Sequence, residues 1–179
     1  GVITAASLRL FPEPAARVVA LLAVPSPRAA LQLLALAGEH VAGLVSGFEL
    51  IHRMGFDFLA ETMPELQAPL QPVPEWQVLM ELELPLGMAP EAVMAGLYQG
   101  AAGAGLVADG VIATSGAQAA GLWQLREAIP LANRKIGAVS SHDISLPLSA
   151  IPDFIAEAPR AIAGLGAFRV NCFGHLGDG

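Results

Sequence analysis

The sequence predicts an α+β fold, in which helices cover one face of an antiparallel sheet. Short apolar runs bounded by proline or glycine alternate with longer segments of helical spacing along the 179 residues. The chain is 54% hydrophobic and only 14% charged, so it can bury a sizeable core. No apolar stretch reaches the roughly 20 residues that a membrane-spanning helix requires, so we expect no membrane span.

The first half of the chain contains four expected strands and one clear helix. The strands are expected at residues 2–10, 17–24, 46–54 and 76–85. Ser26 and Pro27 are typical of an N-cap and a first helical position, which predicts a helix over residues 28–40. Residues 57–74 hold four prolines, so we expect mostly loop with one helical turn. Strict alternation in 76–85 predicts one shared face for Trp76, Val78, Met80 and Leu82.

The second half predicts three helices and three strands in alternation. The helices are expected at 90–103, at 116–135 after a Ser115 cap, and at 147–165. Pro130 should end or kink the second of these near Ile129. The strands are expected at 109–114, 138–147 and 167–174. The resulting order, β-β-α-β-loop-β-α-β-α-β-α-β, fits two split β-α-β units on one antiparallel sheet, a ferredoxin-like arrangement.

Charge and cysteine content exclude some classes of function. The net charge of −7 and the pI near 4.9 argue against nucleic acid as a partner. The single cysteine, Cys172, excludes an internal disulfide framework, and we expect a cytoplasmic protein. The low charge has two explanations: a second domain or subunit covers part of the surface, or the chain is alanine-rich because its genome is GC-rich. The first explanation predicts a homo-oligomer or a further domain.

Two short patterns resemble functional motifs, a dinucleotide-binding loop and a hydrolase triad, but their positions in the predicted elements argue against both. Residues 103–108 loosely fit a dinucleotide-binding pattern, but they follow a helix and precede a strand, the reverse of the required order. Ser140, Ser141, His142 and Asp143 include the residue types of a hydrolase triad. Neighbours on a strand point to opposite faces, so we expect one polar strand face rather than a triad.

Two single residues are candidates for a site. Arg126 lies beside the buried stripe of its helix, where it could hold a carboxylate bidentately or pair with Glu127 or another surface acid. His175 ends the last strand and is followed by a turn of glycines and an aspartate. A lone histidine is more often structural than a metal ligand, since zinc requires three or four ligands.

Four segments, in this order and spacing, resemble the C-terminal part of FAD-linked oxidases. They are GVITAASLRLFPEP, LWQLREAI, SHDISLPLSAIPDFI and FGHLGDG. This family of flavin-dependent 2-hydroxy-acid dehydrogenases includes D-lactate dehydrogenase, the glycolate oxidase flavin subunit and D-2-hydroxyglutarate dehydrogenase. The resemblance implies a fragment of a larger two-domain flavoprotein. Residues 1–14 would then be the strand and joint that leave the FAD-binding domain, and residues 15–179 a substrate or cap domain truncated at its C-terminus.

The resemblance also implies roles for three residues. Arg126 matches an arginine that holds the substrate carboxylate. Ser141 stands at a substrate-binding position where several members have lysine, which leaves recognition of a second carboxylate open. His175 matches the first histidine of a zinc or manganese site, whose other ligands would follow Gly179.

The function implied by the resemblance is oxidation of a small D-2-hydroxy acid to the 2-keto acid. FAD would be bound mainly by the absent domain, and this piece alone would be inactive. No cofactor-binding residue of this chain is identified. The alternative is a non-catalytic ferredoxin-like module for ligand binding or oligomerisation.

Overall fold

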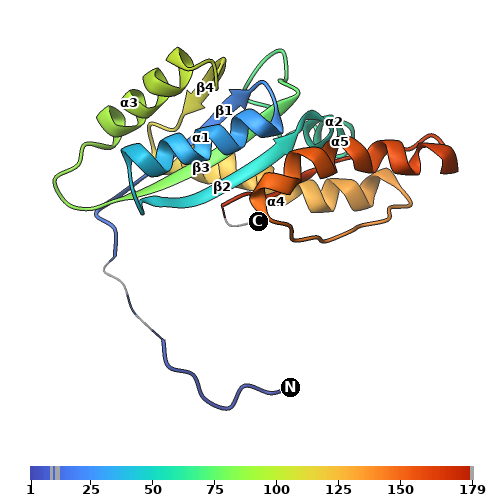
Figure 1. Ribbon diagram of the computed structural model, residues 1–179, viewed down its shortest axis with the longest axis horizontal. Coiled ribbons are helices and arrows are strands. Elements are labelled where there is room, and N and C mark those ends of the chain that lie inside the picture. Colours follow the sequence, from blue (N-terminus) through green and yellow to red (C-terminus); the bar gives the residue numbers. More distant parts are fainter. Residues whose placement is uncertain (9, 11–12, 178–179) are drawn as a thin grey trace.

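The computed structural model describes residues 1–8, 10 and 13–177, and it contains one five-stranded antiparallel sheet with helices on both faces (Figure 1). The strand order is β4-β1-β3-β2-β5. The strands are β1 (Ala16–Val24), β2 (Val45–His52), β3 (Trp76–Leu84), β4 (Asp109–Ile112) and β5 (Phe173–His175). The helices are α1 (Pro27–His40), α2 (Arg53–Thr62), α3 (Pro90–Gly103), α4 (Gly116–Ile136) and α5 (Ile151–Ile162), with 3-10 turns η1 (Leu148–Ala150) and η2 (Ala163–Leu165).

Two split β-α-β units form the centre of the sheet. Helix α1 connects β1 to β2, and these two strands flank β3; helix α3 connects β3 to β4, and these flank β1. The ferredoxin-like prediction and the α+β class are therefore confirmed. Helix α2 and a long loop are inserted between β2 and β3, and the chain after β4 adds α4, α5 and the edge strand β5.

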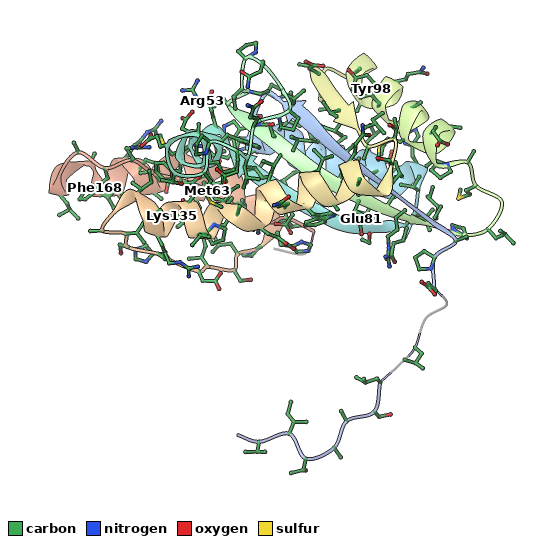
Figure 2. All side chains as sticks on the ribbon, turned by 180° about the vertical axis from the view of Figure 1, so that it is seen from behind. Arg53, Met63, Glu81, Tyr98, Lys135 and Phe168 are labelled. Carbon is green, nitrogen blue, oxygen red and sulfur yellow. The ribbon has the colours of Figure 1, made fainter. Side chains whose placement is uncertain are left out.

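The expectation that helices lie on one face holds only for the two crossover helices. Helices α1 and α3 pack on one face, and α2 and α4 pack on the other, as the opposite views in Figures 1 and 2 show. The cause is the composition of the central strands. In β1, Ala20 and Leu22 face α1 and α3, whereas Val19 and Leu21 face α2 and α4, so both faces must be covered. The predicted shared face of Trp76, Val78, Met80 and Leu82 is confirmed.

Three predicted strands are absent or shorter in the structure. Within 2–10, the described residues are exposed and form no strand, and residues 138–147 are irregular until the turn before α5. The last strand contains only three residues, Phe173–His175. Alternation alone does not form a strand, because a strand also needs a neighbour to complete its hydrogen bonds. Among the described residues, β5 is an edge strand, and it pairs with Glu49, Leu50 and Ile51 of β2.

Two helix predictions also need correction. Helix α2 is longer than the single turn expected, because the first proline of the loop lies beyond its last residue, and strand β2 ends at His52, whose side chain caps α2. Of the two effects expected of Pro130, an end or a kink near Ile129, the end is wrong, because helix α4 continues through Pro130 to Ile136. Burial of Ile129 and Ala132 against α2 holds the helix together across the missing hydrogen bond. The caps at Ser26 and Ser115 are confirmed.

Residues 103–108 form a helix exit, as expected. Gly105 has a φ of +71°, a conformation that favours glycine, and the chain turns there from α3 toward β4. In the part of the chain that the structure describes, we find no helix with both the length and the apolar composition needed to cross a membrane.

Candidate functional site at the edge of strands β2 and β5

A buried carboxylate lies at the centre of the candidate site. Glu49 is in the middle of β2, opposite Leu79 of β3 and His175 of β5, on the face that α4 covers. Its side chain is only 9% exposed. Oε2 accepts a hydrogen bond from Nε of Arg126, and Oε1 lies 3.0 Å from Nδ1 of His175. Of the three predicted site residues, the fold therefore brings Arg126 and His175 together, and both contact Glu49, which was not predicted.

Arg126 reaches this carboxylate from α4. Its Nε and Nη2 lie 2.9 and 2.7 Å from Oε2 of Glu49. The guanidinium carbon lies 5.0 Å from the centre of the Phe173 ring, a cation–π contact with β5. The side chain is 19% exposed, and among the described residues Nη1 makes no hydrogen bond. One edge of the guanidinium is thus occupied, and the edge formed by Nη1 and Nη2 can still bind a carboxylate bidentately.

Two features restrain the His175 ring: a contact between Nδ1 and Glu49, and the backbone at Gly177, which passes close to the ring. The Nδ1 contact with Glu49 assigns the proton of the neutral imidazole to Nδ1. A Cβ at Gly177 would lie 2.6 Å from Nε2, so the chain can pass the ring only because residue 177 is glycine. The imidazole also borders a cleft of about 260 Å³ that Ser46 and Gly47 line.

A second set of polar contacts fixes α4 beside the site. Trp123, one helical turn before Arg126, donates its indole N–H to Oε2 of Glu81 at 2.8 Å. Ser46 donates to Oε1 of the same carboxylate at 3.0 Å. A Cβ at Gly47 would lie 2.9 Å from the Trp123 ring, so this glycine permits the approach of the indole to β2. Figure 2 shows Glu81 beside α4 where the helix crosses the sheet.

Among the described residues, no hydrogen bond or ion pair links Ser141 to this site. It is exposed in the irregular segment between α4 and η1. Its neighbour Ser140 lies 3.1 Å from Nε2 of His142, and both residues are exposed. Among the described residues no hydrogen bond joins this pair to Asp143, so no triad is formed there. Substrate binding by Ser141 stays a prediction.

The described residues do not fit a complete zinc or manganese site. In residues 1–8, 10 and 13–177 no group of three or more His, Cys, Asp or Glu side chains is placed to hold a metal ion. Both oxygens of Glu49 already have partners. Since a zinc site requires three or four ligands, His175 alone does not form one, and its role as a ligand stays a prediction.

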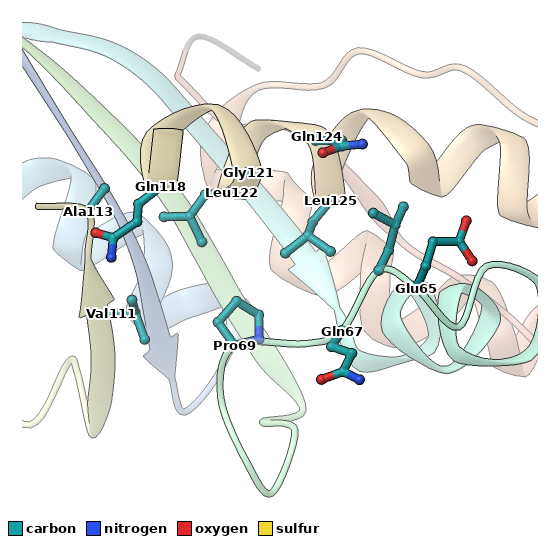
Figure 3. Close-up of a pocket in the computed structure, with 11 residues that line it drawn as sticks. Glu65, Gln67, Pro69, Val111, Ala113, Gln118, Gly121, Leu122, Gln124 and Leu125 are labelled. Carbon is teal, nitrogen blue, oxygen red and sulfur yellow. The ribbon is translucent and has the colours of Figure 1, made fainter. Parts of the chain in front are cut away.

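Other reactive groups in the structure lie outside this site. Burial raises the pKa of the Cys172 thiol to about 11, so the thiol is protonated at neutral pH and is a poor nucleophile. An open cleft of about 320 Å³ lies between α4, β4 and the loop after α2, lined by residues that include Leu66, Pro69, Val111 and Leu122 (Figure 3). None of the predicted site residues lines it.

Sequence reasoning missed Glu49, although the strand carried a signal. Glu49 interrupts the run GFELI, and a carboxylate within a buried strand is almost always paired or hydrogen-bonded. That rule predicts a partner but does not name it. Arg126 and His175 are far away in the sequence, so only the folded chain identifies them.

Comparison with known proteins places the chain in a family. The sequence pattern of the family described as "FAD linked oxidases, C-terminal domain" matches residues 13–179. The mitochondrial D-2-hydroxyglutarate dehydrogenase of Rattus norvegicus is 31% identical over 179 residues, covering 100% of this chain and 33% of the relative. The D-2-hydroxyglutarate dehydrogenase of Xanthomonas citri pv. viticola is 33% identical over 187 residues, covering 100% of this chain and 37% of the relative.

A protein of Schizosaccharomyces pombe named as a mitochondrial D-lactate dehydrogenase is 28% identical over 189 residues, covering 100% of this chain and 36% of the relative. The chain spans only 26 to 37% of the length of these relatives and the others compared. The match to the family covers nearly the whole chain and includes Arg126, Glu49 and His175. The chain therefore belongs to the FAD linked oxidases and corresponds to their C-terminal domain.

Proposed function

We propose that this chain is the substrate-binding part of an FAD-dependent oxidoreductase that oxidises a small D-2-hydroxy acid to the 2-keto acid. Family membership supports the use of FAD, and the relatives named as D-2-hydroxyglutarate and D-lactate dehydrogenases support the substrate class. The observation that carries the proposal is the arrangement of Arg126, in which Glu49 occupies one edge of the guanidinium and the other edge can still bind a carboxylate.

The chain's own residues would bind and orient the substrate. Arg126 would hold the substrate carboxylate through Nη1 and Nη2. His175, whose Nδ1 is held by Glu49, would lie beside the bound substrate. The flavin, when bound by the rest of the protein, supplies a hydride acceptor.

The size of the substrate depends on groups other than Arg126. The relatives' names include a substrate with two carboxylates, D-2-hydroxyglutarate, and one with a single carboxylate, D-lactate. Arg126 provides for one carboxylate, and the proposed substrate-binding position 141 holds an uncharged serine. We therefore extend the proposal to lactate-type and glycolate-type acids as well as 2-hydroxyglutarate. The FAD-binding domain is the proposed partner, and a homo-oligomer and a cytoplasmic location stay predictions.

The test is reduction of the flavin in the full-length protein. An anaerobic visible spectrum is recorded before and after addition of D-lactate, glycolate or D-2-hydroxyglutarate, with L-lactate as the stereochemical control. Bleaching of the flavin by one of the three acids, and not by L-lactate, is the expected result. A protein that binds no flavin would contradict the proposal and favour the ligand-binding or oligomerisation module, with which the fold alone is also compatible.

A matched pair of variants tests the role of Arg126. Arg126→Met keeps most of the side-chain volume but removes the donors, and it should lower kcat/KM about 10- to 100-fold, since a hydrogen bond to a charged group contributes about 1.5–3 kcal/mol. The control is Arg17→Met, because Arg17 forms an exposed ion pair with Glu83 on the same sheet. Equal kcat/KM values for the Arg126→Met variant and wild type would remove Arg126 from the site.

A further inference from the structure

We propose that Glu49 is a positioning residue for this reaction, because one buried carboxylate holds both Arg126 and His175 and so fixes how each meets the substrate. This inference rests on the proposed function and adds to it a residue that neither the sequence motifs nor the family comparison assigns. Glu49 does not reach the substrate itself, since its two oxygens are occupied by the two residues that would.

The burial of Glu49 is hard to explain by stability alone. Its side chain is 9% exposed, on the sheet face that carries the buried cluster of Val19, Leu21, Ile51 and Leu79. Replacement of a buried ion pair by well-packed apolar residues is often neutral or stabilising. An apolar residue at position 49 would meet the needs of the core, so the carboxylate points to a role in arranging its partners.

The first partner acquires a defined direction from Glu49. Nε of Arg126 donates to Oε2 and Nη2 forms an ion-pair contact with the same oxygen, so the rotation of the planar guanidinium is fixed. The Phe173 ring restrains the same group from β5. The edge formed by Nη1 and Nη2 is thereby held in one orientation before substrate arrives, which favours one reactive geometry.

The second partner acquires both a direction and a tautomer. Oε1 of Glu49 accepts the proton of His175 Nδ1, so the ring cannot rotate freely and its acceptor nitrogen is Nε2. Because a single rigid carboxylate serves both partners, the guanidinium and the imidazole are also fixed relative to each other. Helix α4 has a separate anchor in the Trp123–Glu81 hydrogen bond, so loss of Glu49 should disturb the two side-chain ends more than the helix.

Two substitutions at position 49 separate charge from geometry. Glu49→Gln keeps the shape of the side chain but replaces one oxygen by an NH2 group, which donates. The amide can therefore no longer accept hydrogen bonds from both Arg126 and His175. Glu49→Asp keeps the charge but shortens the side chain by about 1.5 Å, so it cannot reach both partners at once. The matched control is Glu83→Gln, which removes an exposed carboxylate from the same face of the sheet. All variants are made in the full-length, flavin-loaded protein.

The measurement is the rate of flavin reduction at increasing concentrations of the 2-hydroxy acid that reduces wild type. It separates the substrate Kd from the limiting reduction rate. In Glu49→Gln and Glu49→Asp, Arg126 still carries its charge, so Kd should change less than about threefold while the limiting rate falls at least tenfold. The Glu83→Gln control should match wild type. Flavin content and melting temperature are measured on every sample, and rates are expressed per bound flavin.

Each outcome has a distinct meaning. A limiting rate within twofold of wild type in both Glu49 variants would overturn the inference, as would a loss that vanishes once rates are corrected for bound flavin. If one variant fails to fold, the other gives the answer. If both fail to fold, Glu49 is a structural residue and the inference is overturned. If no 2-hydroxy acid reduces the flavin of the wild-type protein, the proposed function is overturned instead. This result comes from wild type alone and does not depend on any Glu49 variant.

Discussion

Replacement of Arg126 by methionine should destabilise the chain as well as impair the proposed site. Among the described residues, Arg126 makes two of the three polar contacts of the buried Glu49 carboxylate. Methionine fills a similar volume beside Phe173 but offers no donor. The remaining contact from His175 reaches only Oε1, so Oε2 would be left buried without a partner.

The size of the effect follows from the burial of the pair. Removal of one partner from a buried ion pair costs about 3–5 kcal/mol. The lower end applies here, because the Arg126 side chain is 19% exposed and His175 still contacts the carboxylate. We therefore expect a loss of about 3 kcal/mol in the free energy of unfolding. With an m-value of about 2–3 kcal/mol per molar urea, this loss corresponds to a shift of about 1 M in the midpoint.

Urea unfolding of this 179-residue chain, followed by circular dichroism, measures the effect. The double variant Glu49→Leu/Arg126→Met is the control, since it removes the charge together with its partner and should lie within about 1 kcal/mol of wild type. A single Arg126→Met variant as stable as wild type would refute the reasoning. So would a double variant no more stable than the single one, because the loss could not then come from an unpaired Glu49.

Three further predictions concern residues outside the ion pair. His52 caps α2 by accepting from the Met54 N–H at 3.2 Å, and burial is the main cause that lowers its pKa. Protonation of His52 is less favourable in the folded than in the unfolded chain. Its contribution to the free energy of unfolding should therefore be fully present above pH 6.5 and decrease as the pH falls from 6.5 toward the lower pKa of the folded state. Gln77 is fully buried, and among the described residues neither polar atom of its side chain has a partner; Gln77→Met should raise stability by about 1–3 kcal/mol in urea unfolding. Gly47→Val should cost about 1–3 kcal/mol, because its side chain would meet the Trp123 ring.

Each of these has its own control. His52→Asn retains a capping oxygen and should flatten the dependence of stability on pH between 5 and 7; an unchanged slope would show that other groups cause it. A destabilised Gln77→Met variant would show that the amide makes hydrogen bonds in solution. For Gly47, the control is Gly96→Ala, since a Cβ at Gly96 in helix α3 meets nothing within 4 Å and should be neutral or stabilising. Equal stability of the Gly47→Val variant and wild type would contradict the close approach of the indole.

Local patterns in the sequence were enough to predict the fold class and the family. Period-two alternation in β3, the apolar run of β1 and the caps at Ser26 and Ser115 are local signals that need no tertiary information. The order of these elements was sufficient to predict the split β-α-β units. The four ordered segments were sufficient for the family, because they are matched as a linear pattern.

The tertiary structure alone decided which segments pair and which side chains meet. Residues 138–147 alternate like a strand but are irregular in the structure, whereas three residues of β5 form a strand because β2 offers an open edge. Glu49 could be recognised as a carboxylate in need of partners, but its position between α4 and β5 chose Arg126 and His175. Periodicity is a property of adjacent residues, whereas a site is formed by contacts between residues distant in the chain, and these exist only after the sheet and its two helical layers have packed.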